Sequence, residues 1–253
     1  MKKARFMTMS VGILVTMLNT QQANAALALD RTRVIFPGGG KSVTVNIHNE
    51  NTSLPYLAQS WVEDEKGNKI SSPLVVVPPL QRVEAGSASQ LQIKALPDVK
   101  SLPQDRESVF YFNLREIPPR SNEPNTLQLA LQTRIKLFYR PKSILPSHAQ
   151  MMTPWQDSLT LSREGDDYKV INSTPYFISL VSAGSKNSDA ARSKKFKPLM
   201  VAPKGNASLG VSAASLGSKP TISYINDYGG TRVLTFKCNE SQCKVSGDED
   251  FKN

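Results

Sequence analysis

The chain has 253 residues, and its 31 Lys and Arg outnumber its 21 Asp and Glu to give a net charge of +10. Beyond the first 25 residues, no stretch is long and apolar enough to span a bilayer, which excludes helical membrane spans from the rest of the chain.

The N-terminus has the pattern of a secretory signal peptide. A positive head with Lys2, Lys3 and Arg5 precedes an apolar stretch over residues 6–18, and Ala23-Asn24-Ala25 forms a small-residue cleavage site. We expect cleavage after Ala25, with an uncleaved membrane anchor as the alternative. Removal of 25 of the 253 residues leaves 228, a length typical of two domains of about 100–120 residues.

The charge of the remaining chain narrows the class of partner. The signal peptide carries three of the 31 basic residues, which leaves 28 against 21 acids, an excess of +7. An exported protein seldom meets nucleic acid, so this charge favours an acidic protein surface or a carboxylate ligand. A basic surface that serves only solubility remains the alternative.

The first half of the chain alternates apolar and polar residues with a period of two. The segments with this pattern are residues 42–50, 56–65, 73–79, 89–96 and 108–119. Turn residues separate them, among them the glycines at 38–40, which we expect to form a hairpin turn and not a phosphate loop. About seven short strands at this spacing are typical of an immunoglobulin-like β-sandwich.

A last alternating segment, residues 127–140, is unusually long. Leu127, Leu129, Leu131, Ile135 and Leu137 share one parity, which predicts a β-strand with one apolar face. Its length is well beyond the usual strand of about 5–6 residues. A small domain rarely has enough core to cover such a face, so part of it requires another partner.

A linker and a second β series follow. Residues 140–150 are rich in proline and polar side chains, and five further β-like segments come after them. Residues 184–197 predict a mobile surface loop. Cys238 and Cys243, separated by four residues, predict a local disulfide across a late hairpin. Zinc is the weaker alternative, because two sulfurs without a nearby His or Cys make a poor site.

The sequence shows no catalytic constellation. His48 and His148 are the only histidines, and we interpret both as solvated side chains. The acids at 166–167 and 248–250 lack the spacing of a metal site. Trp61 fits the buried tryptophan of an immunoglobulin-like core. We therefore expect no enzyme activity, no metal and no cofactor.

Four motifs stand out along the chain: "LDRTR" (29–33), "LPQDRESVFYFNLREIPP" (102–119), "LQTRIKLFYRP" (131–141) and "SYINDYGG" (223–230). Together they resemble the periplasmic pilus-assembly chaperones of the chaperone–usher pathway, the family typified by PapD. The resemblance implies an all-β fold, with two immunoglobulin-like β-sandwich domains in a boomerang arrangement around an interdomain cleft. We expect a signal peptide at 1–25 and domains at 26–143 and 144–253. The short segment over residues 116–126 resembles the short-loop class.

The resemblance also implies a function. Such chaperones bind and fold pilus or fimbrial subunits by donor-strand complementation, cap the interactive surface of the subunit and deliver it to an outer-membrane usher. By resemblance, the lent side chains are Leu127, Leu129 and Leu131. No nucleotide or nucleic acid takes part, and self-association is expected to shield the strand when no subunit is bound.

Two further sets of residues follow from the resemblance. Arg33 and Lys136 match the residues that bind the C-terminal carboxylate of the subunit. The matches to a trio of interdomain salt bridges are Glu107, Arg140 and Asp227. The main alternative function is a fimbrial structural subunit or adhesin, although two complete-looking domains argue against it. An exported enzyme or carbohydrate-binding module would need catalytic acids or exposed aromatic platforms, which do not stand out.

Overall fold

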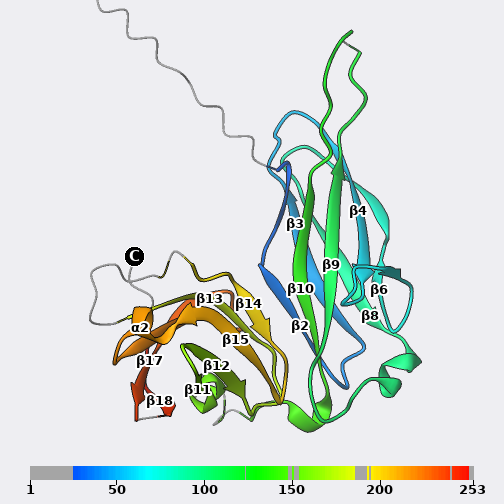
Figure 1. The fold of residues 1–253 in the computed structure, drawn as a ribbon. Coiled ribbons are helices and arrows are strands. Elements are labelled where there is room, and N and C mark those ends of the chain that lie inside the picture. The colour runs from blue at the N-terminus through cyan, green and yellow to red at the C-terminus, as the bar shows by residue number, and fades with distance from the viewer. Residues whose placement is uncertain are drawn as a thin grey trace, which may run out of the picture.

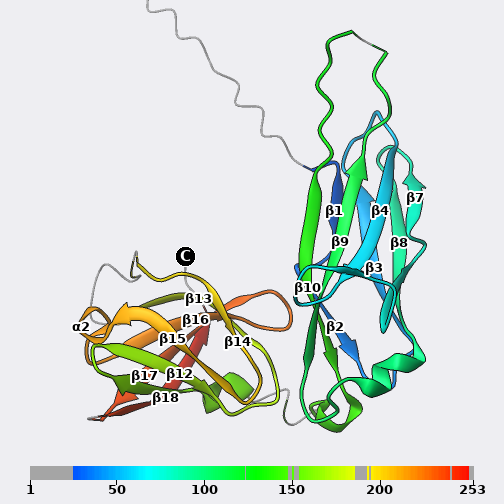
Figure 2. The ribbon, with the colours of Figure 1, turned by 45° about the vertical axis from the view of Figure 1, so that its right-hand side comes forward.

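The computed structural model describes residues 25–122, 124–147, 150, 154–185, 193, 195–239 and 241–250. Figure 1 shows two β-domains set at an angle and joined at one end, and Figure 2 shows the same arrangement after a rotation. The predicted all-β fold with two immunoglobulin-like domains is confirmed. The signal sequence up to Asn24, His148 and most of the expected loop at 184–197 lie outside the described residues.

Ten strands and two 3₁₀ helices form the first domain. They are β1 (Leu27–Leu29), β2 (Arg33–Pro37), β3 (Ser42–Asn49), β4 (Tyr56–Glu63), β5 (Lys69–Ile70), β6 (Leu74–Val77), β7 (Leu80–Val83), β8 (Ala88–Ala95), η1 (Pro97–Ser101), β9 (Ser108–Ile117), β10 (Gln132–Arg140) and η2 (Lys142–Ile144). One sheet has the order β1-β3-β8-β6, and the other has β2-β10-β9-β4-β5, with β7 pairing with β4.

The two sheets pack face to face because each strand turns one parity inward. Val45 and Leu91 from the first sheet are fully buried, as are Phe112 and Leu137 from the second. These residues belong to a single core cluster, so the apolar parity read from the sequence is the inner face of a sandwich.

Strand β10 is shorter than the predicted strand at 127–140. It begins at Gln132, and residues 127–131 form one arm of a long hairpin without strand pairing, drawn in green at the upper end of Figure 1. The register of β10 with β9 would place Leu129 opposite Pro118 and Gln128 opposite Pro119. Proline has no backbone N–H, so the ladder cannot continue past Ile117.

Trp61 is not the core tryptophan that the sequence predicted. Ala58, Ser60 and Val62 of β4 are buried, so Trp61, of the opposite parity, lies on the outer face of the sheet, partly exposed. Its indole N–H donates to the Glu63 carboxylate at 2.8 Å, and the guanidinium of Arg115 lies 5.2 Å from the ring centroid. The core here is filled by Phe112 and its neighbours instead.

The glycine turn after β2 also differs from expectation. It joins strands of two different sheets and is therefore not a hairpin turn. A Cβ on Gly38 would meet the backbone of Pro141 and Lys142 at 2.6–2.8 Å. Glycine is needed at this position because the segment that leaves the domain crosses directly over it.

The second domain is built on one curved sheet. Its elements are η3 (Trp155–Ser158), β11 (Thr160–Glu164), β12 (Asp167–Asn172), β13 (Ile178–Ser185), β14 (Leu199–Val201), β15 (Gly205–Ser212), α2 (Ala213–Leu216), β16 (Pro220–Ile225), β17 (Thr231–Cys238) and β18 (Gln242–Asp250). The order is β14-β13-β16-β17-β18-β11-β12-β15, and the end strands β14 and β15 contact each other. The sheet thus folds around its own core, with Tyr224 and Phe236 fully buried.

The predicted disulfide between Cys238 and Cys243 is confirmed, and it joins β17 to β18 at positions that face each other in the ladder. Over the described residues, no helix has the length and apolar character that a membrane crossing requires. The same residues contain no group of three or more potential metal ligands.

Candidate functional site

A row of three leucines lies exposed on the hairpin arm that leads into β10. Leu127, Leu129 and Leu131 are 81%, 62% and 39% exposed. Ile135 and Leu137 have the same parity but are buried in the core of the first domain. The apolar residues of this parity, interrupted only by Thr133, are thus buried in the C-terminal half of the segment and exposed in its N-terminal half. We call Leu127, Leu129 and Leu131 the leucine row.

The backbone beside this row is incompletely paired. Strand β2 pairs in parallel with residues Lys136–Arg140 of β10 and reaches no further. From Gln132 to Ile135, β10 pairs only with β9, on its other side. Within the described part of the chain, this edge of β10 is thus open to a further strand beside the exposed leucines.

Two cations lie at the closed end of the same edge. Arg33 and Lys136 are direct neighbours across the β2–β10 pair, and both are partly buried. The Arg33 guanidinium donates to the Ile225 carbonyl at 3.1 Å, and the Lys136 ammonium donates to the Ser179 hydroxyl at 2.8 Å. Both acceptors are neutral and belong to the second domain. We call Arg33 and Lys136 the cation pair.

The neighbouring cations differ in this respect. Arg31 forms a salt bridge with Asp30 at 2.7 Å, and Arg134 forms one with Glu63 at 2.8 Å. In the part of the chain that the structure describes, the cation pair has no such bridge. Of these four cations, the two matched by resemblance are therefore the ones whose charge remains available to an outside anion.

The surroundings of the cation pair disfavour the charged form of both side chains. Burial lowers the pKa of Lys136, and the nearby charge of Arg33 lowers it further. Burial also lowers the pKa of Arg33, opposed by the more distant charges of Asp227 and Glu107. The Arg33 Nε is buried without a hydrogen-bond partner. A bound carboxylate would raise the pKa of both cations, because it supplies a negative charge, and it would add a hydrogen-bond acceptor beside them.

Arg140 links the two domains through paired carboxylates. It donates to Glu107 and to Asp227, each at 2.8 Å, and both Arg140 and Glu107 are almost fully buried. Glu107 also accepts from the backbone N–H of Phe177 at 2.7 Å, so the first domain is bonded to the second there as well. Burial raises the pKa of Glu107 to about 7, against the opposing charge of Arg140. We call Glu107, Arg140 and Asp227 the domain-joint network.

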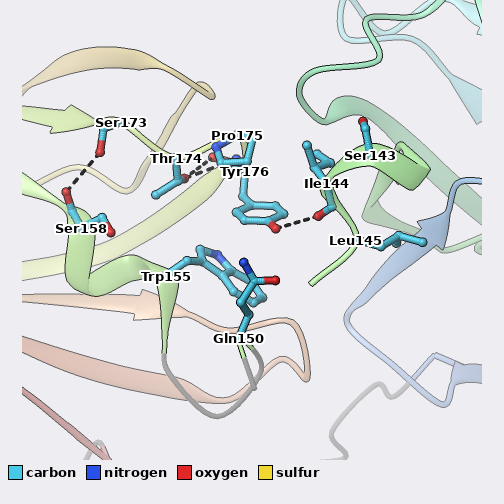
Figure 3. Close-up of a pocket in the computed structure, with 10 residues that line it drawn as sticks. All are labelled: Ser143, Ile144, Leu145, Gln150, Trp155, Ser158, Ser173, Thr174, Pro175 and Tyr176. Atoms are coloured by element: carbon cyan, nitrogen blue, oxygen red, sulfur yellow. Dashed lines mark hydrogen bonds between the residues drawn. The ribbon is translucent and has the colours of Figure 1, made fainter. Parts of the chain in front are cut away.

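Aromatic rings enclose the same joint. The Arg140 guanidinium lies 5.2 Å from the ring centroid of Trp155 and 4.7 Å from that of Tyr176. Figure 3 shows Trp155 beside Tyr176, whose hydroxyl donates to the Ile144 carbonyl at 2.7 Å. The cavity in that view, about 380 Å³, lies between the linker and the second domain. These contacts connect the two domains through the linker, next to the salt bridges.

Several residues of the site were missed by the sequence analysis. Ser179 and the Ile225 carbonyl meet the cation pair, and Trp155 and Phe177 join the domain-joint network. Ile225 lies inside the "SYINDYGG" motif, which is a signal that points to this segment. Ser179 carries no sequence signal, because a serine on an alternating strand is unremarkable until its neighbour in the other domain is known.

Comparison with known proteins decides the family. A model described as "Pili and flagellar-assembly chaperone, PapD N-terminal domain" matches residues 26–145, and one described as "Pili assembly chaperone PapD, C-terminal domain" matches residues 154–236. The chain belongs to the PapD family of pilus-assembly chaperones. It is accordingly a chaperone and not an enzyme.

Relatives of known name agree with this family. The chain is 46% identical to the "Probable fimbrial chaperone YfcS" of Escherichia coli K12, over 97% of this chain and 95% of that one. It is also 46% identical to the "Chaperone protein PapD" of Escherichia coli, over 90% and 92% of the two chains. A chain of the "Salmonella enterica SafA pilin in complex with the SafB chaperone" superposes with a TM-score of 0.65, at 25% identity and over 92% and 98% of the chains.

Proposed function

We propose that this protein is a periplasmic chaperone that folds pilus or fimbrial subunits by lending them a β-strand. Residues 1–25 direct its export, and the mature domains span residues 26–143 and 144–253. The chaperone caps the interactive surface of the subunit and delivers it to an outer-membrane usher. Family membership and the complex of a related chaperone with a pilin support subunits as the partner class.

The observation that carries this proposal is the exposed leucine row beside an open strand edge. A subunit that lacks its final strand exposes its own core and a row of unpaired backbone groups. The edge of β10 pairs that backbone, and the leucine row fills that core. Scaled by their exposed fractions of 81%, 62% and 39%, burial of the three leucine side chains contributes on the order of 3–5 kcal/mol before ordering costs. An incomplete domain thereby gains a core that its own sequence does not supply.

The cation pair supplies the second half of the site. It binds the C-terminal carboxylate of the subunit through charge-assisted hydrogen bonds. Arg33 and Lys136 lie side by side where β2 first pairs with β10, so the last residue of an added strand ends there. The domain-joint network holds the second domain against this point, because Asp227 and Ile225 belong to the same turn region of that domain.

Co-purification tests this function with a matched control. The protein is co-expressed in a periplasm with the subunits encoded beside its gene, as wild type, Arg33→Ala, Lys136→Ala and Arg134→Ala. Arg134 lies on the same strand and face as Lys136 but is already paired with Glu63. We expect wild type and Arg134→Ala to recover a one-to-one complex, and both cation-pair variants to lose it while remaining folded.

Three results count against the proposal. Binding by both cation-pair variants at the wild-type level would show that these residues do not hold the carboxylate. An equal loss in Arg134→Ala would show that any cation on this face serves. Failure of the wild type to recover any subunit would count against the chaperone function itself.

The usher and the subunit-free state belong to the same proposal. Without a subunit, a second copy of the chain covers the leucine row by pairing along the open edge of β10. Light scattering of the purified protein, compared with a Leu129→Asp variant, measures this self-association. The usher step is measured by retention of the chaperone–subunit complex, and not of the free chaperone, on immobilised usher.

A further inference from the structure

The cation pair faces a matching pair of residues in the second domain. Arg33 and Lys136 are partners across the β2–β10 pair of the first domain. Ser179 and Ile225 are partners across the β13–β16 pair of the second domain. Each cation bonds to one member of the opposite pair, at 3.1 and 2.8 Å. We call these four residues the corner.

The two acceptors in the corner are neutral, whereas a carboxylate side chain in their place would form a salt bridge with the cation pair. Ile225 offers only its backbone carbonyl, and Ser179 offers a hydroxyl that is 4% exposed. An acid at position 179 would neutralise Lys136 and occupy the place of an incoming carboxylate. A hydroxyl holds the ammonium by one hydrogen bond and leaves its charge unmatched.

The hydroxyl also fixes a side chain that is otherwise variable. Lys136 has four rotatable side-chain bonds, and ordering such a side chain costs conformational entropy. An ammonium has three N–H donors, so one bond to Ser179 leaves two donors for a ligand. A group that is already ordered binds more tightly, because less freedom is lost on association.

We propose that Ser179 is a positioning residue that holds the Lys136 ammonium in place for the subunit carboxylate, so that the second domain takes part in capture. This inference rests on the proposed function of the cation pair. It assigns to β13 a role that neither the sequence motifs nor the salt bridges of the joint include. The hydroxyl acts through Lys136.

Two substitutions of equal shape separate the hydroxyl from packing. Ser179→Thr keeps the hydroxyl, and Ser179→Val replaces it with a methyl group in the same position. The probe is a synthetic peptide of the C-terminal strand of the subunit encoded beside the gene, prepared as the free acid and as the C-terminal amide. Dissociation constants are measured for both peptides, and melting temperatures are recorded for every variant.

We expect wild type and Ser179→Thr to bind the free acid more tightly than the amide. Ser179→Val should bind the acid about 2- to 10-fold more weakly than Ser179→Thr, the range given by one hydrogen bond, with no change for the amide. Ser179→Asp should lose the preference for the acid, because the new carboxylate pairs with Lys136. A merely structural serine would not produce this split between the two peptides.

The possible failures are distinguishable. If wild type prefers the acid but Ser179→Val does so equally, the role of Ser179 is wrong and the cation pair stands. If Ser179→Val weakens both peptides to the same degree and melts lower than Ser179→Thr, Ser179 is only a packing residue. If wild type binds acid and amide alike, the carboxylate site of the proposed function fails, and the inference fails with it.

Discussion

Truncation of single leucines in the leucine row should weaken subunit binding in the order of their exposure. Leu127, Leu129 and Leu131 are 81%, 62% and 39% exposed in the free protein. Only the exposed part of each side chain remains to be buried by a subunit, so the residue nearest the hairpin tip has the most to contribute. Truncation of Leu127 should barely change the stability of the free chaperone, whereas truncation of Leu131, most of which is already buried, should lower that stability as well.

The magnitudes follow from these fractions. Full burial of a leucine contributes about 1.5–3 kcal/mol. Scaled by the exposed 81%, Leu127→Ala should cost about 1.2–2.4 kcal/mol of complex stability. The exposed 39% of Leu131 gives about 0.6–1.2 kcal/mol for Leu131→Ala. Since about 1.4 kcal/mol is tenfold in affinity, the two variants should differ by a factor of about 3–7.

Urea titration of the purified chaperone–subunit complex measures this difference, with the free chaperone titrated alongside. Leu80→Ala is the matched control, because Leu80 is 50% exposed but lies on β7, across the sheet from β10. We expect the control to leave the complex unchanged. A larger loss for Leu131→Ala than for Leu127→Ala would refute the reasoning, and so would an equal loss for Leu80→Ala.

Two further predictions concern the joint between the domains. Arg140→Ala leaves Glu107 buried without its cation, which costs about 3–5 kcal/mol. Burial raises the pKa of Glu107 from 4.5 to about 7, so its contribution to stability is present below pH 4.5 and lost as the pH rises through about 7. The defect of Arg140→Ala should therefore be small near pH 4 and grow towards pH 8 in calorimetry; a defect independent of pH would contradict this. Gly229 and Gly67 have φ of +85° and +86°, but only at Gly229 would a Cβ collide with Thr32. Replacement of either glycine by Ala should cost about 1 kcal/mol of stability. Only Gly229→Ala should also weaken subunit binding, as measured by co-purification, because its Cβ would displace Thr32, the residue before Arg33. Equal binding by the two variants would show that the contact between Gly229 and Thr32 is unimportant for binding.

Much of the fold follows from local pattern. The period of two predicts β3 and β8 to within a residue or two, because their inner parity is buried and their outer parity is polar. The spacing of Cys238 and Cys243 predicts a disulfide that the ladder places at opposed positions. These features depend on contacts between neighbouring strands, which leave a signature in the sequence.

Other features depend on residues that are distant in the sequence, and the local pattern of a segment does not show them. The parity of Leu127 and Leu129 is that of a strand, but Pro118 and Pro119 on the opposite arm remove the donors for pairing. Trp61 was wrongly predicted as buried, because β4 turns its small residues inward and its tryptophan outward. Ser179 meets Lys136 only because the two domains contact each other, and such a contact between residues 43 apart in sequence leaves no local pattern.

In the proposed complex, the leucine row and the cation pair would together determine the register of the added strand, and neither would do so alone. At about 3.3 Å per residue, an extended chain places Leu131, Leu129 and Leu127 roughly 17, 23 and 30 Å from Lys136. A slip of one residue would turn the leucines to the wrong face. A slip of two residues would return the leucines to the correct face. Its only cost would be the loss of the contact between the carboxylate and the cation pair. In that complex the leucines would exclude slips by an odd number of residues and the cations slips by an even number, so a subunit strand of defined length would be held in one register.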